Sequence, residues 1–109
     1  MVSANGAYKL RLQEEDGNLC VYKYANGKQG SFVWGSMKSG FKNGCQTMQT
    51  DGNLVVYDDK NVSKWSSQTN PIYDAKYNDA NNKPVKLVLE NDGVLKLYNA
   101  QNAVIWSSK

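Results

Sequence analysis

Residues 49–57 read Gln-Thr-Asp-Gly-Asn-Leu-Val-Val-Tyr, an Asp-Gly turn signal followed by a short run of alternating side chains. An Asp-Gly pair between alternating segments is a strong signal for a β-hairpin. Successive side chains of a strand point to opposite faces, so Leu54 and Val56 share one face while Asn53 and Val55 share the other. The stretch therefore predicts a hairpin with one apolar face and one polar face.

The hairpin belongs to a unit that occurs three times along the chain. The copy at about 83–109 aligns without a gap with the copy at about 43–69. The offset between equivalent residues is 41 throughout, as between Asp51 and Asp92. The copy at about 5–37 aligns when one residue is inserted in its turn. A strand-rich unit repeated three times can bury its apolar face only against the other two, which implies pseudo-threefold symmetry.

Turn signals and alternating segments locate the other strands. The expected strands are residues 7–12, 19–22, 31–34, 45–49, 54–57, 85–89 and 95–98, and units two and three close on a Trp-Ser-Ser segment. Residues 68–84 are rich in Asn and Asp and hold both prolines, which is typical of a long surface connection. With 109 residues, we expect one all-β domain over residues 1–109.

Two sets of apolar residues recur in equivalent positions of the three units. The pair that follows each turn gives the candidate core residues Leu19, Val21, Leu54, Val56, Leu95 and Leu97. Trp34, Trp65 and Trp106 also occupy one equivalent position per unit, so we expect them to pack together near the threefold axis. Stacking of these tryptophans on a bound sugar or base is the alternative.

Composition excludes several classes of function. The net charge of +3 comes from scattered lysines and one arginine, which argues against nucleic acid as a partner. No apolar run is long enough for membrane insertion. There is no histidine, two cysteines cannot form a zinc site unaided, and no nucleophile has an activating base, so we expect neither a metal site nor an enzyme. No signal peptide is visible, so we expect a cytoplasmic rather than a secreted protein, although a mature secreted chain with an added Met would look the same.

The polar face of the central hairpin has the chemistry of a sugar site. Gln49, Asp51, Asn53 and Tyr57 surround one apolar side chain, Val55. An ionised Asp accepts hydrogen bonds, while an amide and a phenol can both donate and accept, which suits adjacent hydroxyls of a sugar ring. The alternative is a structural role, because Asp and Asn also stabilise turns through their own backbone. The residues therefore leave a binding site and a stabilised turn as two open interpretations.

The spacing Gln49-x-Asp51-x-Asn53-x-Val55-x-Tyr57 matches in full the sugar-binding motif of the bulb-type (monocot, snowdrop-agglutinin-like) mannose-binding lectins, which the whole chain resembles. The resemblance implies a β-prism II fold with three antiparallel sheets and up to three shallow sites for mannose or high-mannose glycans. It implies no cofactor and no metal. It assigns the axial 2-hydroxyl of mannose to Asp51 and Asn53, and the apolar contact to Val55.

The other two copies depart from the motif. The first copy supplies Gln13, Asp16, Asn18, Cys20 and Tyr22, with one extra residue before the Asp; without that insertion, Glu14 would take the Gln position. The third copy keeps only Asp92 and Tyr98, because Glu90, Val94 and Lys96 replace the Gln, Asn and Val. We expect a usable first site and a degenerate third site.

The resemblance leaves several properties open. In the plant proteins a disulfide begins at the position of Gly17, whereas Cys20 lies three residues further on, so we expect Cys20 and Cys45 to be free thiols. The chain can be a monomer or a homodimer. A protein-binding or cytoskeletal adaptor, or a toxin-like protein, that uses the degenerate third face is the alternative function.

Overall fold

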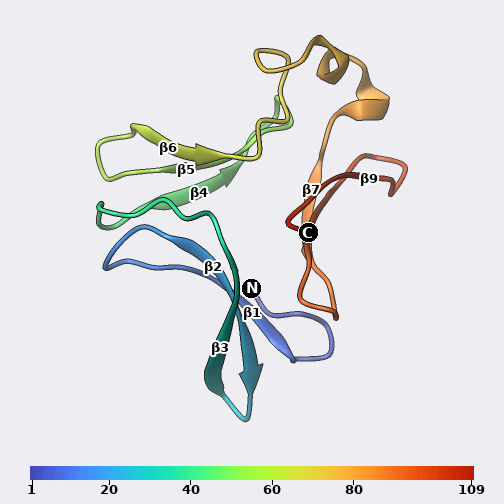
Figure 1. The fold of residues 1–109 in the computed structure, drawn as a ribbon. Helices are drawn as coiled ribbons and strands as arrows, with labels where there is room; N and C mark the ends of the chain where they lie inside the picture. Colours follow the sequence, from blue (N-terminus) through green and yellow to red (C-terminus); the bar gives the residue numbers. More distant parts are fainter.

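The computed structural model describes residues 1–109 and contains three antiparallel sheets of three strands each (Figure 1). The sheets follow one another along the chain, and in each the strands are paired in sequence order. The strands are β1 Tyr8–Leu12, β2 Leu19–Ala25 and β3 Lys28–Gly35; β4 Cys45–Met48, β5 Leu54–Tyr57 and β6 Ser63–Ser66; and β7 Lys86–Leu89, β8 Leu95–Tyr98 and β9 Val104–Ser107. The all-β fold and the arrangement of one sheet per repeat are confirmed.

The central strand of each sheet supplies the core. The six apolar residues expected there, which follow the three turns in β2, β5 and β8, are each at most 1% exposed. Burying these side chains removes apolar surface from water, which is the main favourable contribution to folding. The core prediction is therefore confirmed.

The three tryptophans meet at the centre of the prism. The ring centroids of Trp34, Trp65 and Trp106 lie 5.8, 5.9 and 6.0 Å apart in their three pairs, with interplanar angles of 70–74°. This is the edge-to-face geometry that aromatic rings prefer. The packing interpretation of the tryptophans is confirmed.

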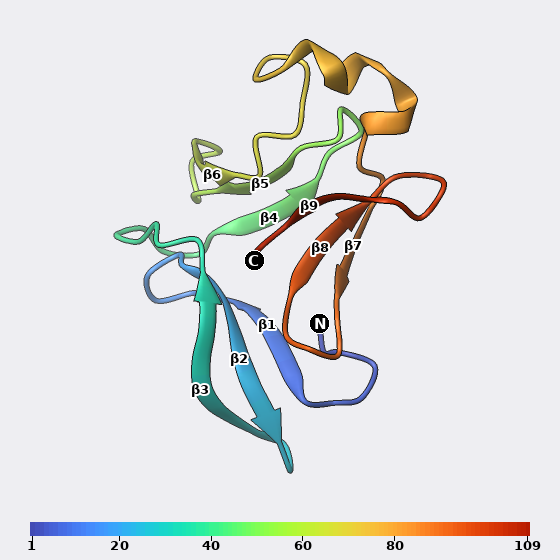
Figure 2. The same ribbon diagram turned by 45° about the vertical axis from the view of Figure 1, so that its right-hand side comes forward.

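The first unit has the longest hairpin. Strands β2 and β3 run on past the length of their counterparts and project from the body of the molecule (Figure 2). The extension was expected only in part, because the strand segments predicted here, 19–22 and 31–34, are shorter than the observed ones. A register shift at Tyr22 lets the two strands continue to the turn at Asn26.

The connection between units two and three is more than a surface loop. Residues 68–84 contain two short 3-10 helices, η1 Ala75–Asn78 and η2 Ala80–Asn82, and run beyond the end of the β4–β6 sheet before entering β7 (Figure 2). The interpretation of this stretch as surface is wrong at four positions: Thr69 is 1% exposed, Asn70 5% and Tyr77 8%, and Pro84 is fully buried. None of the helices has the length and apolarity needed to cross a membrane.

Candidate functional site

The turns of units one and two share a backbone frame that fixes their alignment. The N–H of Gln49 donates to the carbonyl of Asn53 across the turn (2.9 Å), and the N–H of Gln13 donates in the same way to the carbonyl of Asn18 (3.0 Å). Gln13, and not Glu14, therefore stands at the position of Gln49. The inserted residue of unit one lies within its turn.

The Asp of each turn bonds the backbone two residues further on. Asp51 Oδ1 accepts the N–H of Asn53 at 3.0 Å, and Asp16 Oδ1 accepts the N–H of Asn18 at 2.9 Å. This bond is the usual way in which Asp stabilises a turn. The turn-stabilising interpretation is thus correct for one oxygen of each carboxylate, and it leaves the second oxygen available for other partners.

Asn53 in the second site is held through its carbonyl oxygen. Oδ1 accepts the hydroxyl of Ser67 (3.2 Å) and the backbone N–H of Thr69 (3.3 Å), and the residue is only 4% exposed. The Nδ2 group donates to no protein atom. An Asn fixed in this way presents one amide donor beside the carboxylate of Asp51.

The remaining residues of the second site are Gln49, Val55 and Tyr57. Gln49, directly after β4, donates through Nε2 to the hydroxyl of Tyr57, at the end of β5, which leaves Gln49 Oε1 without a protein partner. Val55 lies between them in sequence and is only 3% exposed. A ligand could touch little more than the tip of this valine, so the apolar contact expected there is small.

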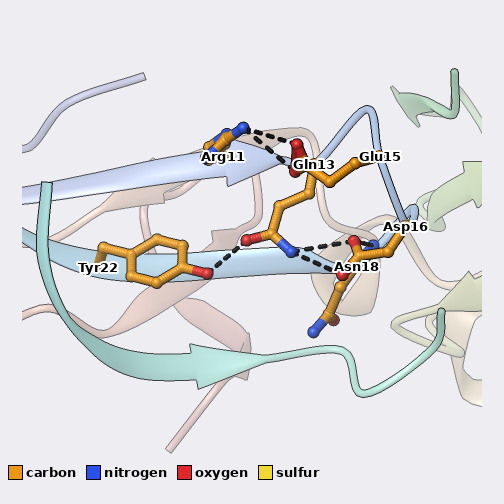
Figure 3. A network of polar contacts seen from close by, with 6 residues as sticks. All are labelled: Arg11, Gln13, Glu15, Asp16, Asn18 and Tyr22. Atoms are coloured by element: carbon orange, nitrogen blue, oxygen red, sulfur yellow. Dashed lines mark hydrogen bonds and ion pairs between the residues drawn. The ribbon is translucent and has the colours of Figure 1, made fainter. Parts of the chain in front are cut away.

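The first site forms a continuous chain of side-chain bonds (Figure 3). Gln13 Nε2 donates to both carboxylate oxygens of Asp16, at 2.9 and 3.0 Å, and the Tyr22 hydroxyl donates to Gln13 Oε1. Beside it, Arg11 forms an ion pair with Glu15 at 3.1 Å. Gln13 thus holds the carboxylate of Asp16, whereas its counterpart Gln49 makes no hydrogen bond to Asp51.

No protein-family model matches the chain. Curculin-2 of Molineria latifolia is 37% identical over 59 residues, which are 53% of this chain and 34% of that protein. The chain thus spans about a third of the length of the curated relative that it matches.

Two solved structures match nearly the whole chain. The monomeric monocot mannose-binding lectins from Gastrodia elata match at 29% identity and a TM-score of 0.69, covering 96% of this chain and 82% of that one. The Marasmius oreades lectin matches at 28% identity and a TM-score of 0.72, covering 100% and 78%. The chain is therefore similar in sequence and fold to the bulb-type lectins. Its three-sheet structure is the β-prism of these carbohydrate-binding proteins, as the resemblance implied.

Electrostatics differ between the three sites of the protein. The pKa of Asp16 lies below its ordinary value because the Asn18 N–H and the Gln13 side chain both bond the ionised carboxylate. Burial raises the pKa of Tyr22 and of the Cys20 thiol. At the third site, the hydrogen bond to Glu90 raises the pKa of Tyr98. The first site therefore combines a stable carboxylate with a neutral phenol.

The third site of the protein lacks the amide donor. Asp92 Oδ1 bonds the N–H of Val94 at 3.0 Å, so the turn is kept, but Val94 stands where Asn53 stands in unit two. Tyr98 donates its hydroxyl to the carboxylate of Glu90, and Lys96 occupies the position of the valine. The structure thus brings together Glu90, Asp92 and Tyr98 without a side chain that could replace the missing Asn.

The two cysteines of the protein are not joined to each other. Cys20 is buried in β2 at the position equivalent to Val55, and Cys45 is exposed at the start of β4. No group of three or more histidine, cysteine, aspartate or glutamate side chains is arranged to hold a metal ion.

One residue at the second site could not be expected from the repeats. Asn70, in the connection after unit two, donates through Nδ2 to Asp51 Oδ2 at 3.2 Å. The connection is longer than residues 36–44, which join units one and two, and differs from them in sequence, so aligning the repeats does not place Asn70. Three-residue and four-residue helices also give no periodic pattern from which its course could be predicted.

Proposed function

We propose that this protein is a lectin of the bulb type that binds mannose and high-mannose glycans without catalysing a reaction. The observation that carries the proposal is the pairing at the second site of a carboxylate acceptor, Asp51 Oδ2, with a fixed amide donor, Asn53 Nδ2. A sugar hydroxyl both donates and accepts a hydrogen bond, so it fits between one acceptor and one donor. The mannose-binding lectins from Gastrodia elata, similar over nearly the whole chain, support mannose as the sugar.

The axial 2-hydroxyl is the group that we assign to this pair. Mannose differs from glucose by that orientation, so an acceptor and a donor placed side by side can select it. Gln49 and Tyr57 lie across the site and would bond the neighbouring hydroxyls. Galactose, with an equatorial 2-hydroxyl, would leave the Asp51–Asn53 pair without a matching partner.

The first and second sites are expected to differ in affinity. At the first site, Gln13 occupies both oxygens of Asp16, so a sugar must compete with two existing hydrogen bonds. At the second site, Asp51 Oδ2 has a single protein donor, at 3.2 Å. A single shallow site of this kind binds at about millimolar affinity, near −4 kcal/mol, so strong binding to glycans needs several sites at once.

An NMR titration tests the proposal. Methyl α-mannoside should shift the backbone amides beside Val55 at lower concentration than those beside Cys20, and methyl α-galactoside should shift neither. If neither sugar shifts the amide signals, the proposal is wrong. Partners recovered from an extract undiminished by excess mannose would instead support the protein-binding alternative.

The most informative variant is Asn53→Asp. It keeps the oxygen that accepts from Ser67 and Thr69 but replaces the amide donor, so we expect mannoside affinity at the second site to fall by about tenfold or more, the value of one good hydrogen bond to a polar ligand. The matched variant Asn18→Asp should have the same effect on the first site alone. Asn53→Ala is the poorer choice, since it removes the acceptor of a buried N–H at a cost of about 1–3 kcal/mol in stability.

A further inference from the structure

We propose that Asn70 is a positioning residue of the second sugar site, which orients the Asp51 carboxylate toward the ligand; this inference rests on the proposed function. Asn70 Nδ2 donates to Asp51 Oδ2 at 3.2 Å, while Asp51 Oδ1 is held by the turn. Both oxygens of the carboxylate are thereby fixed. The rotation of the Asp51 side chain is set before a sugar arrives.

The orientation of the Asn70 amide follows from its surroundings. The residue is 5% exposed, and its Oδ1 is buried without a hydrogen-bond partner. Rotating the amide by half a turn would bring this oxygen against the carboxylate of Asp51, so the donor must face Asp51. A buried acceptor without a partner is unfavourable. The protein tolerates it here because the same amide holds the carboxylate.

The backbone that carries Asn70 is anchored on both sides. On one side, the Thr69 hydroxyl donates to the carbonyl of Gly52 at 2.6 Å and also lies 2.8 Å from the Ser67 hydroxyl. On the other side, the carbonyl of Asn70 accepts the N–H groups of Tyr73 and Asp74 at 3.1 and 3.2 Å. Asn70 is therefore placed by the fold itself and does not depend on the sugar.

Comparison of the first and second turns shows why the second site needs such a residue. At the first site Gln13 holds both oxygens of Asp16. At the second site Gln49 bonds Tyr57 and does not reach Asp51. The ion pairs of the chain are Arg11–Glu15 and Lys64–Asp58, so no cation holds this carboxylate either. Asn70 takes over the role of Gln13 and leaves Gln49 Oε1 available to a ligand.

Two variants separate positioning from a merely structural role. In Asn70→Ala, Asp51 loses its orienting partner, and we expect mannoside affinity at the second site to fall about tenfold, as for a lost hydrogen bond to a charged group. In Asn70→Asp, a like charge faces Asp51 at neutral pH, so binding should fall at least as far. The pKa of the introduced carboxyl should be raised by its neighbour, and at about pH 5 its protonated form can donate to Asp51 as the amide did.

The experiment is a methyl α-mannoside titration followed by NMR at about pH 7.5 and about pH 5. Amides beside Val55 report the second site, and amides beside Cys20 report the first site in the same molecule. Recovery of second-site binding on acidification in Asn70→Asp, with no recovery in Asn70→Ala, is the expected result. Asn81→Ala, an exposed position of the same connection whose side chain makes no hydrogen bond, is the control and should bind as the wild type does.

Each outcome decides between the two proposals. Wild-type binding at the second site that is unchanged in Asn70→Ala would overturn the role of Asn70 and leave the proposed function intact. A wild type silent toward mannoside would overturn the proposed function and, with it, this inference. If Asn70→Ala does not fold, as shown by loss of the first-site response, Asn70→Asp decides: no recovery at low pH overturns the inference.

Discussion

Asp16 is the most constrained carboxylate of the three turns. It accepts one backbone N–H from Asn18 and two bonds from the Gln13 amide, and all three favour its ionised form. Its pKa is therefore lowered, with the backbone bond as the largest cause. A carboxylate held in this way stays charged where an ordinary Asp begins to take up a proton.

Binding at the first site should accordingly be resistant to mild acid. Because the pKa of Asp16 is lower in the folded protein than its ordinary value of 3.8, its contribution to stability is present above that value. The contribution is lost as the pH falls through the lowered pKa. A carbon-detected NMR titration of the Asp16 carboxyl should give a midpoint below that of a peptide of residues 13–18, and Gln13→Ala should move the midpoint back up. A midpoint equal to that of the peptide would contradict the prediction.

Single residues were predictable where the repeats align. Strand alternation predicted that Asn53, Val55 and Tyr57 share one face, and the spacing of the motif added Gln49 and Asp51, which lie before and in the turn. Asn70 was not predictable, since a hydrogen bond from a segment without internal symmetry leaves no mark in the spacing of residues. The small exposure of Val55 also depends on neighbouring side chains, which alternation does not describe.

At the scale of elements, the connection formed by residues 68–84 packs against the turn of unit two. Gly52 lies in this turn with a φ of +97°, and a Cβ there would lie 2.9 Å from the carbonyl oxygen of Thr69 and 3.1 Å from Pro84 Cδ. Glycine is thus required twice, by the backbone conformation and by the close approach of the connection. Gly40 has a similar φ of +91° with nothing within 4 Å of an added Cβ.

This pair of glycines allows conformational strain and packing to be separated. Gly40→Ala should cost about 1–2 kcal/mol, the strain of a left-handed conformation. Gly52→Ala should cost about 1–3 kcal/mol more, because the backbone of the connection must move to admit the methyl group. Urea unfolding of both variants measures the difference. Equal losses in the two variants would mean that the connection does not press on the turn.

Elements were predictable in proportion to their regularity. The short hairpins β4–β5 and β7–β8 follow directly from Asp-Gly turns between alternating segments. The extent of β2–β3 could not be predicted, because a register shift within the pair interrupts the alternation on which strand prediction depends. The helices η1 and η2 are too short to show a helical period.

At the scale of the whole molecule, the tryptophan triad links the three sheets. Each of Trp34, Trp65 and Trp106 contacts the other two at nearly the same distance and angle. The overall fold was predictable because one apolar face per unit, repeated three times, has a symmetric way of being buried. How tightly the indoles meet could be learned only from the structure.

The three pairs of tryptophans should be coupled equally in stability. Double-mutant cycles with Trp→Leu substitutions are expected to give about 0.5–1.5 kcal/mol for each pair, the usual value of an edge-to-face contact beyond the area it buries. Denaturant unfolding provides the free energies. Cycles of Trp34 with Ile72, whose side chain is 88% exposed, serve as the control and should give no coupling. A vanishing value for one indole pair would show that the triad is not a symmetric unit.

The closure of the triad also bears on how such a chain can change. Each unit contributes one indole and one apolar strand face to the core. Each is buried against the indoles and the apolar strand faces of the other two units. A change on the polar face of one unit therefore leaves the shared core in place, as Val94 in the third unit shows beside Asn53 in the second.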